Sequence, residues 1–281
     1  MKLLTFLAGR YIAGATRGDA IKVVKRLNRK GLLATIDILG ENVQDKEEAD
    51  ANTNEYLSLL EDIKKEGVLS TISFKLTHIG LDISDELVRK NAEKIIKRTE
   101  ELRNFARFDM ERSGYTQKTL DIFLEVAKKH QNAGIAIQSS LKRSADDIKL
   151  LIGKKASVRL VKGAYKEPPD IAFESKKDVD SNFSALMKEL LSKGSYPAIA
   201  THDVGLIDEA KKFARDNKIT KDRFEFQMLL GIKRTLQKKL VDNGYRVRVY
   251  VPYGKNWLPY VLRRFRERKE NIWFVIKNIF D

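Results

Sequence analysis

The residues best suited to bind an anion lie in one basic stretch, residues 250–267, which reads YVPYGKNWLPYVLRRFRE. If a helix begins near Trp257, then Tyr260 stands three and four positions before Arg263 and Arg264, and residues at that spacing are neighbours on a helix. A phenol and a guanidinium group on one face could hold a carboxylate between them. From this pattern alone, the anion could equally be a phosphate, a folate or a lipid.

Other polar residues stand at the ends of short apolar runs that have the length of buried strands. They are Asp37 and Glu41, Lys75, Asp109, Gln138, Arg159 with Lys162, Thr201 with His202, Gln227, and Tyr250 with Tyr253. An unpaired polar group is costly to bury. Polar residues this frequent at strand ends therefore favour a polar pocket over a packed apolar plug.

Three of these residues each allow two interpretations. Lys75 is either a solvated or paired lysine or an ammonium group that faces an anionic substrate. Asp109 is either a functional group of the pocket or the buried partner of an arginine. Both interpretations would hold if that arginine were Arg263 or Arg264. Arg159 lies inside the apolar run VRLV, so it must either pair or point into the pocket.

The segment VKGAY (161–165) places a glycine directly after a predicted strand, where the backbone could approach a ligand closely. The chain contains neither a P-loop nor a dinucleotide-binding fingerprint, so a nucleotide would be held in another way. Gln138, Thr201 and His202 are also consistent with ordinary hydrogen-bonded strand ends. The sequence has no cysteine, no HxxxH motif and no histidine cluster, which argues against thiolate chemistry and a metal site.

The elements that must position these residues alternate along the chain. Apolar runs lie at 32–40, 69–76, 104–109, 134–138, 157–161, 197–201, 223–227 and 246–251, and helix-like segments lie at 17–30, 47–66, 83–102, 116–132, 144–153, 179–193, 206–217 and 231–243. This alternation predicts an α/β protein with a parallel sheet, and the count of strands favours a closed (βα)8 TIM-type barrel over an open doubly wound sheet. The active site of such a barrel lies at the C-terminal ends of its strands.

We predict a single domain over residues 1–281: a distorted barrel with an N-terminal helix and with the last helix over its mouth. The length suits one α/β barrel, and no low-complexity linker divides the chain. The apolar run in MKLLTFLAGRYIAG (1–14) is shorter than that of a signal peptide, which favours a helix of the mature protein. No stretch approaches the ~20 apolar residues that cross a bilayer.

The formal net charge of +15 permits attraction to nucleic acid, acidic lipid or small anions. Many of the lysines alternate with acidic residues in helix-like segments such as 142–155 and 209–221. This pattern is typical of a solvated outer face. We therefore expect no nucleic-acid partner.

A series of motifs resembles one known family. The motifs are RYIAG (10–14), LATIDILGE (33–41), SFKLT (73–77), FDME (108–111), IAIQSSLKR (135–143), VRLVKGAY (158–165), ATHD (200–203), FEFQMLLG (224–231), RVYVPYG (248–254) and YVLRRFRE (260–267). Together, and in this order, they resemble the FAD-dependent proline dehydrogenases in their monofunctional form. They cover almost the whole chain, which is more specific than any single motif.

The resemblance implies roles for individual residues. Arg263 and Arg264 would bind the proline carboxylate together with Lys75, and bidentate guanidinium groups suit that task. Tyr250 and Tyr260 would lie near the substrate ring, and Asp109 would order the cluster. The expected FAD contacts are Met110, Gln138, Arg159, Val161, Lys162, Gly163, Thr201, His202 and Glu267. Arg159 would also face the flavin N5 region and favour the reduced state, and Glu41 would pair with a substrate-clamping arginine as a gate.

The reaction implied by the resemblance is the first step of proline catabolism. L-Proline would be oxidised at ring carbon C5 to 1-pyrroline-5-carboxylate by hydride transfer to FAD N5, with the amine neutral and no residue assigned to its proton. Asp203 stands where many relatives have asparagine, which could alter the protonation of His202.

The resemblance further implies a cytoplasmic enzyme that passes electrons to a quinone or another acceptor. A separate pyrroline-5-carboxylate dehydrogenase would take the product, because the chain is too short to carry a fused one. The apolar segment NIWFVIKNIFD (271–281) either contacts the inner face of the membrane peripherally or packs on the barrel.

Two other functions are consistent with parts of the sequence. One is a different FAD barrel, such as a methylenetetrahydrofolate-reductase-like enzyme that acts with NADH, although the arginine pair is better explained by a small amino acid. The other is a basic protein that binds nucleic acid or a membrane surface without catalysis. A flavin spectrum with and without L-proline would separate the three.

Overall fold

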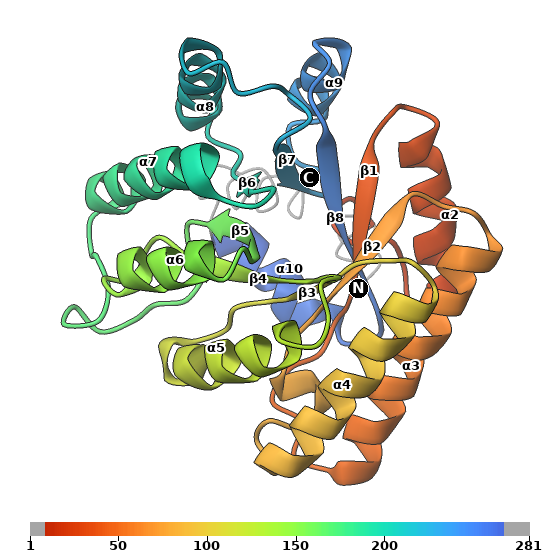
Figure 1. Cartoon of the computed structure of the whole chain (residues 1–281). Helices are drawn as coiled ribbons and strands as arrows, with labels where there is room; N and C mark the ends of the chain where they lie inside the picture. The colour runs from red at the N-terminus through yellow and green to blue at the C-terminus, as the bar shows by residue number, and fades with distance from the viewer. Residues whose placement is uncertain (1–8, 267–281) are drawn as a thin grey trace, which may run out of the picture.

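Eight parallel strands form a closed barrel in the computed structural model, which describes residues 9–266 and side chains as far as Val261 (Figure 1). Each strand pairs with the next, and β1 pairs with β8 to close the ring. The strands are β1 (Leu33–Ile38), β2 (Ser70–Phe74), β3 (Ala106–Phe108), β4 (Ala133–Gln138), β5 (Ser157–Val161), β6 (Ala198–Ala200), β7 (Glu225–Leu229) and β8 (Val247–Tyr253). The predicted (βα)8 fold and its eight strands are confirmed.

Helices alternate with the strands and surround the barrel, as Figure 1 shows. They are α2 (Arg17–Asn28), α3 (Lys46–Lys65), α4 (Asp85–Glu101), α5 (Ser113–Ala127), α6 (Ser144–Gly153), α7 (Lys176–Lys193), α8 (Val204–Asp216), α9 (Arg234–Asp242) and α10 (Trp257–Arg266). Side chains of Thr16, Asp45, Ser84, Ser175 and Asp203 accept hydrogen bonds from free backbone N–H groups at the starts of α2, α3, α4, α7 and α8. Such N-caps fix where each helix begins.

The barrel departs from the regular pattern at its seam. Helix α2, which precedes β1, packs against both β1 and β8, where an eighth outer helix would otherwise lie. Helix α10 instead lies over the C-terminal ends of the strands, and its Tyr260 lines the cavity there. The predicted distortion and the position of the last helix are confirmed.

The N-terminal helix of the described chain is α2. Residues 9–14, for which we predicted a helix, form a turn and irregular chain, so that prediction is wrong for this part. Residues 1–8 lie outside the described residues. The segment 11–14 runs beside the end of β8, because the N–H of Ala13 donates to Pro252 O (2.8 Å) and the N–H of Gly254 donates to Gly14 O (3.0 Å).

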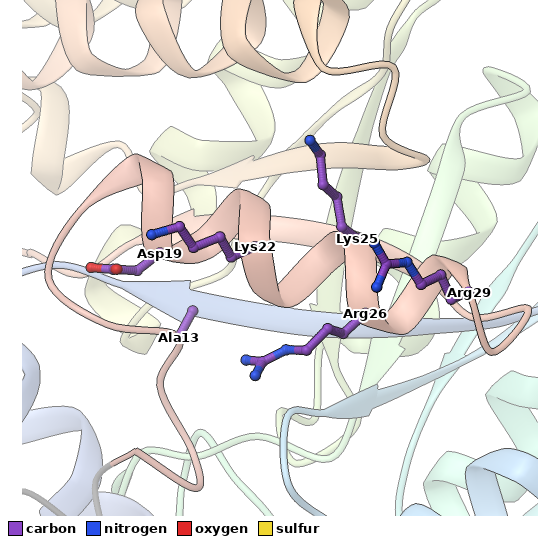
Figure 2. Close-up of a pocket in the computed structure, with 6 residues that line it drawn as sticks. All are labelled: Ala13, Asp19, Lys22, Lys25, Arg26 and Arg29. Atoms are coloured by element: carbon purple, nitrogen blue, oxygen red, sulfur yellow. The ribbon is translucent and has the colours of Figure 1, made fainter.

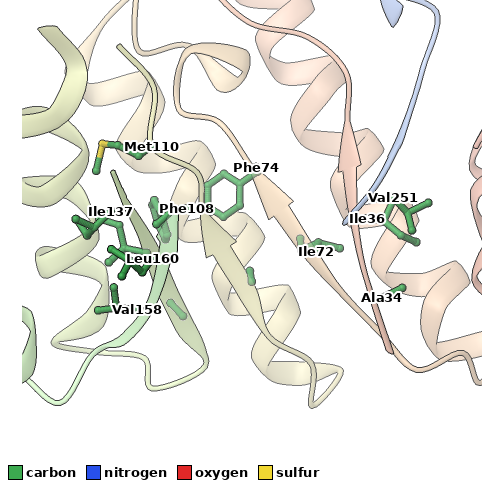
Figure 3. Packing of buried hydrophobic residues seen from close by; sticks show 14 of the residues in the cluster. Ala34, Ile36, Ile72, Phe74, Phe108, Met110, Ile137, Val158, Leu160 and Val251 are labelled. Carbon is green, nitrogen blue, oxygen red and sulfur yellow. The ribbon is translucent and has the colours of Figure 1, made fainter. Parts of the chain in front are cut away.

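The main hydrophobic core lies between the strands and the helices that cover them, and Figure 3 shows part of it. Ile36, Ile72 and Phe74 are fully buried there. The ring of Phe108 lies 4.5 Å from that of Phe74 and 5.5 Å from that of Phe123 on α5, measured between centroids. Full burial of an aliphatic or aromatic side chain is worth about 1.5–3 kcal/mol, so this layer holds the helices on the barrel.

The inside of the barrel, in contrast, is rich in charged and polar side chains. Successive residues of a strand point to opposite faces, so the apolar residues of β7 and β8 alternate with polar ones. Arg107, Arg159 and Glu225 are each at least 95% buried. TIM barrels usually fill this space with branched apolar residues. Here hydrogen-bonded charges fill it instead.

Candidate active site

A cavity of about 720 Å³ opens at the C-terminal ends of the strands. The predicted substrate and FAD residues whose side chains are described all line it. These residues are Lys75, Asp109, Met110, Gln138, Arg159, Val161, Lys162, Gly163, Thr201, His202, Tyr250 and Tyr260. Strands far apart in the chain therefore bring the predicted residues to one place.

Arg159 on β5 lies at the inner end of this cavity and uses all three guanidinium nitrogens. Its Nη1 donates to Asp109 Oδ1 (2.5 Å), its Nη2 to Ser73 Oγ (2.8 Å) and its Nε to Gln227 Oε1 (2.6 Å). The guanidinium carbon also lies 5.5 Å from the centre of the Tyr250 ring. Because the planar fork is fixed from three directions, the cation has one orientation.

Asp109 is the buried partner of an arginine, as one of its two interpretations required. That arginine is Arg159, and a further contact with Arg263 or Arg264 stays a prediction. The other carboxylate oxygen, Oδ2, accepts from the Tyr250 hydroxyl at 2.7 Å. Burial, followed by the charge of Asp109, raises the pKa of Tyr250 well above its usual value. The phenol is therefore protonated and acts as a donor.

Lys75 forms a buried ion pair with Asp37. Its Nζ donates to both carboxylate oxygens of Asp37, at 3.0 and 3.1 Å. Burial raises the pKa of Asp37 to about 6 against the attraction of Lys75. Although burial opposes it, the charge of Asp37 raises the pKa of Lys75. At neutral pH the pair is charged, and Lys75 is both a paired lysine and a cation that lines the cavity.

The other side of the cavity is formed by β4, β5 and the loop after β6. The Gln138 amide donates to Glu111 O at 2.8 Å, and the His202 Nε2 accepts from the Leu229 N–H at 2.9 Å. A neutral His202 therefore carries its proton on Nδ1. Gly163 has φ +114°, and a Cβ there would lie 2.2 Å from Ser140 Oγ. Only glycine fits this position.

Asp203 forms hydrogen bonds with Lys162 and with the start of α8. Its Oδ2 accepts from Lys162 Nζ at 3.1 Å, and its Oδ1 accepts from the N–H of Gly205 at 3.0 Å at the start of α8. Lys162 also pairs with Asp180 on α7. Asp203 thus holds Lys162 at the edge of the cavity, and its effect on the protonation of His202 stays a prediction.

Some predicted residues cannot be placed in the site. The backbone of Arg263 and Arg264 belongs to α10, but their side chains lie outside the described residues, as do Glu267 and the segment 271–281. Glu41 is half-buried after β1, and its predicted pairing as a gate stays a prediction.

The cavity also contains residues that were not among the predicted site residues. They are Asp37, Ala136, Ala164, Tyr165, Lys166, Ala200, Asp203, Gln227, Met228 and Leu229. Asp37 and Gln227 carried a signal, since both are polar residues at strand ends. Tyr165 and Lys166 continue the glycine-containing segment and carried no signal beyond that position.

A second, smaller hollow of about 340 Å³ lies on the outside of the barrel along α2 (Figure 2). Its charged lining residues are Asp19, Lys22, Lys25, Arg26 and Arg29. Lys25 pairs with Glu66 at 2.5 Å. The hollow lacks the buried, hydrogen-bonded polar groups of the mouth and has the character of a solvated basic face.

The described part of the chain offers no cluster of histidine, aspartate and glutamate residues that could hold a metal ion. Among the helices of that part, none is both long and apolar enough to cross a membrane.

Comparisons with known proteins identify relatives of this chain. A family profile described as proline dehydrogenase matches residues 20–277. The chain is 42% identical over 272 residues to proline dehydrogenase 1 of Bacillus subtilis (strain 168), which covers 97% of this chain and 90% of that protein. It is 37% identical over 278 residues to proline dehydrogenase of Deinococcus radiodurans, with the same coverage of both chains.

Among solved structures, proline utilization A (PutA) from Bdellovibrio bacteriovorus, inactivated by N-propargylglycine, superposes with a TM-score of 0.89 and 27% identity. The match covers 94% of this chain but only 32% of that much longer chain. The shared barrel is thus one part of the PutA chain.

Proposed function

Because the chain belongs to the proline dehydrogenase family, we propose that it oxidises L-proline to 1-pyrroline-5-carboxylate, the first step of proline catabolism. One observation carries the proposal beyond the family match: the fixed cation of Arg159, hydrogen-bonded to Asp109, lies in the same cavity as Lys75 and Tyr260. One cavity thus combines a region for a small anion with a region that can influence the charge of a cofactor.

The cofactor that we propose is FAD, and the cavity fits a flavin nucleotide in three respects. Its volume lies within the usual range of about 300–1,000 Å³ for ligand sites. Its wall combines apolar groups, such as Met110, Val161 and Met228, with the cation of Lys162. At Gly163 the backbone lies where a side chain would clash, so it can approach a ligand closely.

In this arrangement, FAD would be held by Met110, Gln138, Arg159, Val161, Lys162, Gly163, Thr201, His202 and Glu267. When bound, the flavin supplies an acceptor for a hydride, that is, for two electrons and a proton, which none of the amino acid side chains can be. The fixed positive charge of Arg159 would favour the negative charge that a flavin gains on reduction. Such preorganised charge costs no rearrangement during the reaction.

The substrate carboxylate would be bound by Arg263 and Arg264 on α10, with Lys75 on the barrel side. Tyr250 and Tyr260 would flank the ring of proline, and α10 would keep water out of the mouth. Fixing the carboxylate orients the C5–H bond, and orientation of this kind supplies a large share of a rate enhancement.

The fate of the electrons and of the product completes the proposal. We propose that the protein is cytoplasmic and that it passes its electrons to a quinone-type acceptor. Transfer to a membrane quinone would require the protein to contact the membrane surface peripherally. A separate pyrroline-5-carboxylate dehydrogenase would act next.

An absorbance spectrum of the purified protein tests the proposed reaction. We expect a flavin spectrum that bleaches when L-proline is added without oxygen. A flavin that bleaches with NADH but not with L-proline would favour the folate-reductase-like alternative. A colourless protein would favour a basic binding protein without catalysis.

Variants of the two arginines test the assignment of the substrate site. Arg263→Ala and Arg264→Ala should each raise the KM for L-proline at least tenfold, because a charge-assisted hydrogen bond is worth about 1.5–3 kcal/mol. Both should retain bound FAD. Loss of FAD from both variants would mean that these arginines bind the cofactor instead.

A further inference from the structure

The interior of the barrel contains a chain of hydrogen bonds that ends on Arg159 and is not part of the proposed contacts with substrate or FAD. Gln227 lies between Arg159 and Glu225, and each of the three side chains is at least 95% buried. The Oε1 of Gln227 accepts from Arg159 Nε at 2.6 Å, and its Nε2 donates to Glu225 Oε1 at 2.5 Å. Gln227 and Glu225 are two apart on β7, so both point into the barrel.

The amide of Gln227 has only one orientation that satisfies both neighbours. A guanidinium group has donors only, so the amide oxygen must face Arg159. Burial favours a raised pKa for Glu225, but the charge and hydrogen bonds of Arg248 outweigh it and lower the pKa. An ionised carboxylate has acceptors only, so the amide nitrogen must face Glu225.

Glu225 is itself fixed from the opposite side. Arg248 on β8 donates to it through Nε (2.7 Å to Oε1) and Nη2 (3.0 Å to Oε2). The remaining Nη1 of Arg248 donates to the backbone oxygen of Ala34 on β1 at 2.9 Å. The hydrogen bonds therefore connect Arg159 to the backbone of β1 through β7 and β8.

We propose that Gln227, supported by Glu225 and Arg248, is a positioning residue that fixes the guanidinium plane of Arg159 at the barrel mouth. This inference rests on the proposed function, in which the charge of Arg159 acts on the flavin. Asp109 and Ser73 hold the two terminal nitrogens, and Gln227 holds the Nε edge, so without it the guanidinium plane loses one of the three contacts that fix it.

An amide has an advantage over a carboxylate at position 227. A glutamate there would also accept a hydrogen bond from Arg159. However, the guanidinium already has the negative charge of Asp109 beside it, and a glutamate would add a second. Charges a few ångströms apart interact strongly in a buried site. Gln227 therefore orients Arg159 without cancelling the field of its cation.

Two variants of Gln227 separate orientation from charge. Gln227→Met keeps the length of the side chain and removes both hydrogen bonds. We expect kcat to be at least tenfold lower and the KM for L-proline to stay within twofold of wild type. The two-electron reduction of bound flavin should be about tenfold less favourable, which lowers its midpoint potential by roughly 30 mV. Gln227→Glu places a second carboxylate against Glu225, so one of the two should bind a proton; at a pH high enough to remove that proton, the variant should lower the flavin potential further, because it then adds negative charge beside the cation.

Gln237→Met on α9 is the matched control. Gln237 is as buried as Gln227, but its amide nitrogen donates to the backbone oxygen of Ile232 at 2.8 Å. This variant should lower the midpoint of thermal unfolding and leave the flavin potential unchanged. Titration with a chemical reductant gives the potential in each case and does not depend on proline.

The proposal is overturned if folded Gln227→Met keeps the wild-type flavin potential and kcat. It is also overturned if Gln237→Met shifts the potential as much as Gln227→Met does, or if both Gln227 variants lose FAD. Failure of L-proline to reduce the wild-type flavin would contradict the proposed function instead. The reductant titration would still show whether Gln227 controls the charge at the flavin.

Discussion

Asp109 distributes its two carboxylate oxygens between a cation and a phenol. Oδ1 accepts from Arg159 and Oδ2 from Tyr250, so one residue fixes a group on β5 and a group on β8. Hydrogen bonds with a charged partner are worth about 1.5–3 kcal/mol. At the residue scale, the site is therefore a network in which removal of one donor affects more than one side chain.

Tyr250→Phe tests this network at a single atom. The variant removes the hydroxyl that donates to Asp109 and keeps the ring beside Arg159. We expect kcat/KM for L-proline to fall about 10- to 100-fold, in line with the loss of one charge-assisted hydrogen bond. Steady-state kinetics measure it. A Tyr245→Phe variant, which removes a hydroxyl just before β8 begins at the other end of the barrel, should retain wild-type kcat/KM; equal losses in the two variants would contradict the assignment.

The burial of His78 makes the free energy of unfolding depend on pH. It is buried in the 3-10 turn Thr77–Ile79, and a Cβ on Gly40 would lie 2.2 Å from its Nε2. Burial, then the charge of Lys75, lowers the pKa of His78 to about 3. The unfolded chain takes up a proton near pH 6.5, so the stability gained from neutral His78 is present above that pH and is lost as the pH falls toward 3.

Urea unfolding at pH 7.5, 5.5 and 4.5 checks this dependence. In His78→Gln, the free energy of unfolding should fall less between pH 7.5 and 4.5 than in wild type, by up to about 1.4 kcal/mol per pH unit. His130 provides the contrast, since the glutamates beside it raise its pKa although burial opposes this. His130→Gln should therefore lose stability mainly at low pH. The same change of slope in both variants would rule out the explanation.

At the scale of elements, the loop between β5 and α7 is attached to the neighbouring helix α5. The carboxylate of Glu167 accepts from the N–H of Ser113 (2.9 Å) and from its hydroxyl (2.5 Å) at the start of α5. No side-chain cap comes from Arg112, the residue that precedes this helix. Glu167 thus caps the N-terminus of α5 from another element. The same hydrogen bonds hold the loop that begins with Lys162 and Gly163 against α5.

Glu167→Ala should loosen both elements. Loss of an N-cap costs about 1 kcal/mol, so we expect roughly fivefold faster amide hydrogen exchange at the start of α5 and in residues 162–170. Hydrogen exchange followed by mass spectrometry measures it. Glu174→Ala removes an exposed glutamate from the same loop and should leave exchange unchanged. Protection retained in Glu167→Ala would show that the loop is held by other contacts.

At the scale of the whole molecule, one closed barrel joins segments from both ends of the described chain. The β1–β8 pairing links residues more than 200 positions apart, from Leu33↔Arg248 to Ile38↔Tyr253. Structures with such a closure lose their packing together when one part of the core fails. The single domain that we predicted should therefore unfold in one transition.

Phe123→Ala tests this cooperativity from the outer layer. Phe123 is fully buried on α5 against Phe108, and truncation of a buried phenylalanine costs about 3–5 kcal/mol. The urea midpoints by circular dichroism and by flavin fluorescence should fall together. Leu150→Ala, at a residue 44% exposed, should change little. Separate midpoints for the two signals would indicate more than one folding unit.

Much of the fold could be predicted from the sequence because the apolar runs are short, bounded and evenly spaced. Boundaries were less certain: β7 runs to Leu229 and β8 to Tyr253, two residues beyond the predicted ends in each case. Both extensions are paired to a neighbouring strand. Their ends are set by that pairing, which local sequence does not contain.

The site residues could be predicted as strand ends, whereas their partners could not. Lys75 meets Asp37 across 38 positions and Arg159 meets Asp109 across 50. These pairs depend on the register of neighbouring strands and on which side chains point inward, so only the closed barrel determines them. A contact of Asp109 with Arg263 or Arg264 stays a prediction, because the side chains of these arginines lie outside the described residues.

The short segment 11–14 beside β8 affects how the protein is made. Tyr11 and Ile12 pack in one cluster with Tyr260 and Val261 of α10, so residues separated by about 250 positions must meet to form it. During synthesis, this packing can form only after α10 has left the ribosome. A nascent chain therefore completes its active site only once α10 has been made, and its apolar residues stay exposed until then.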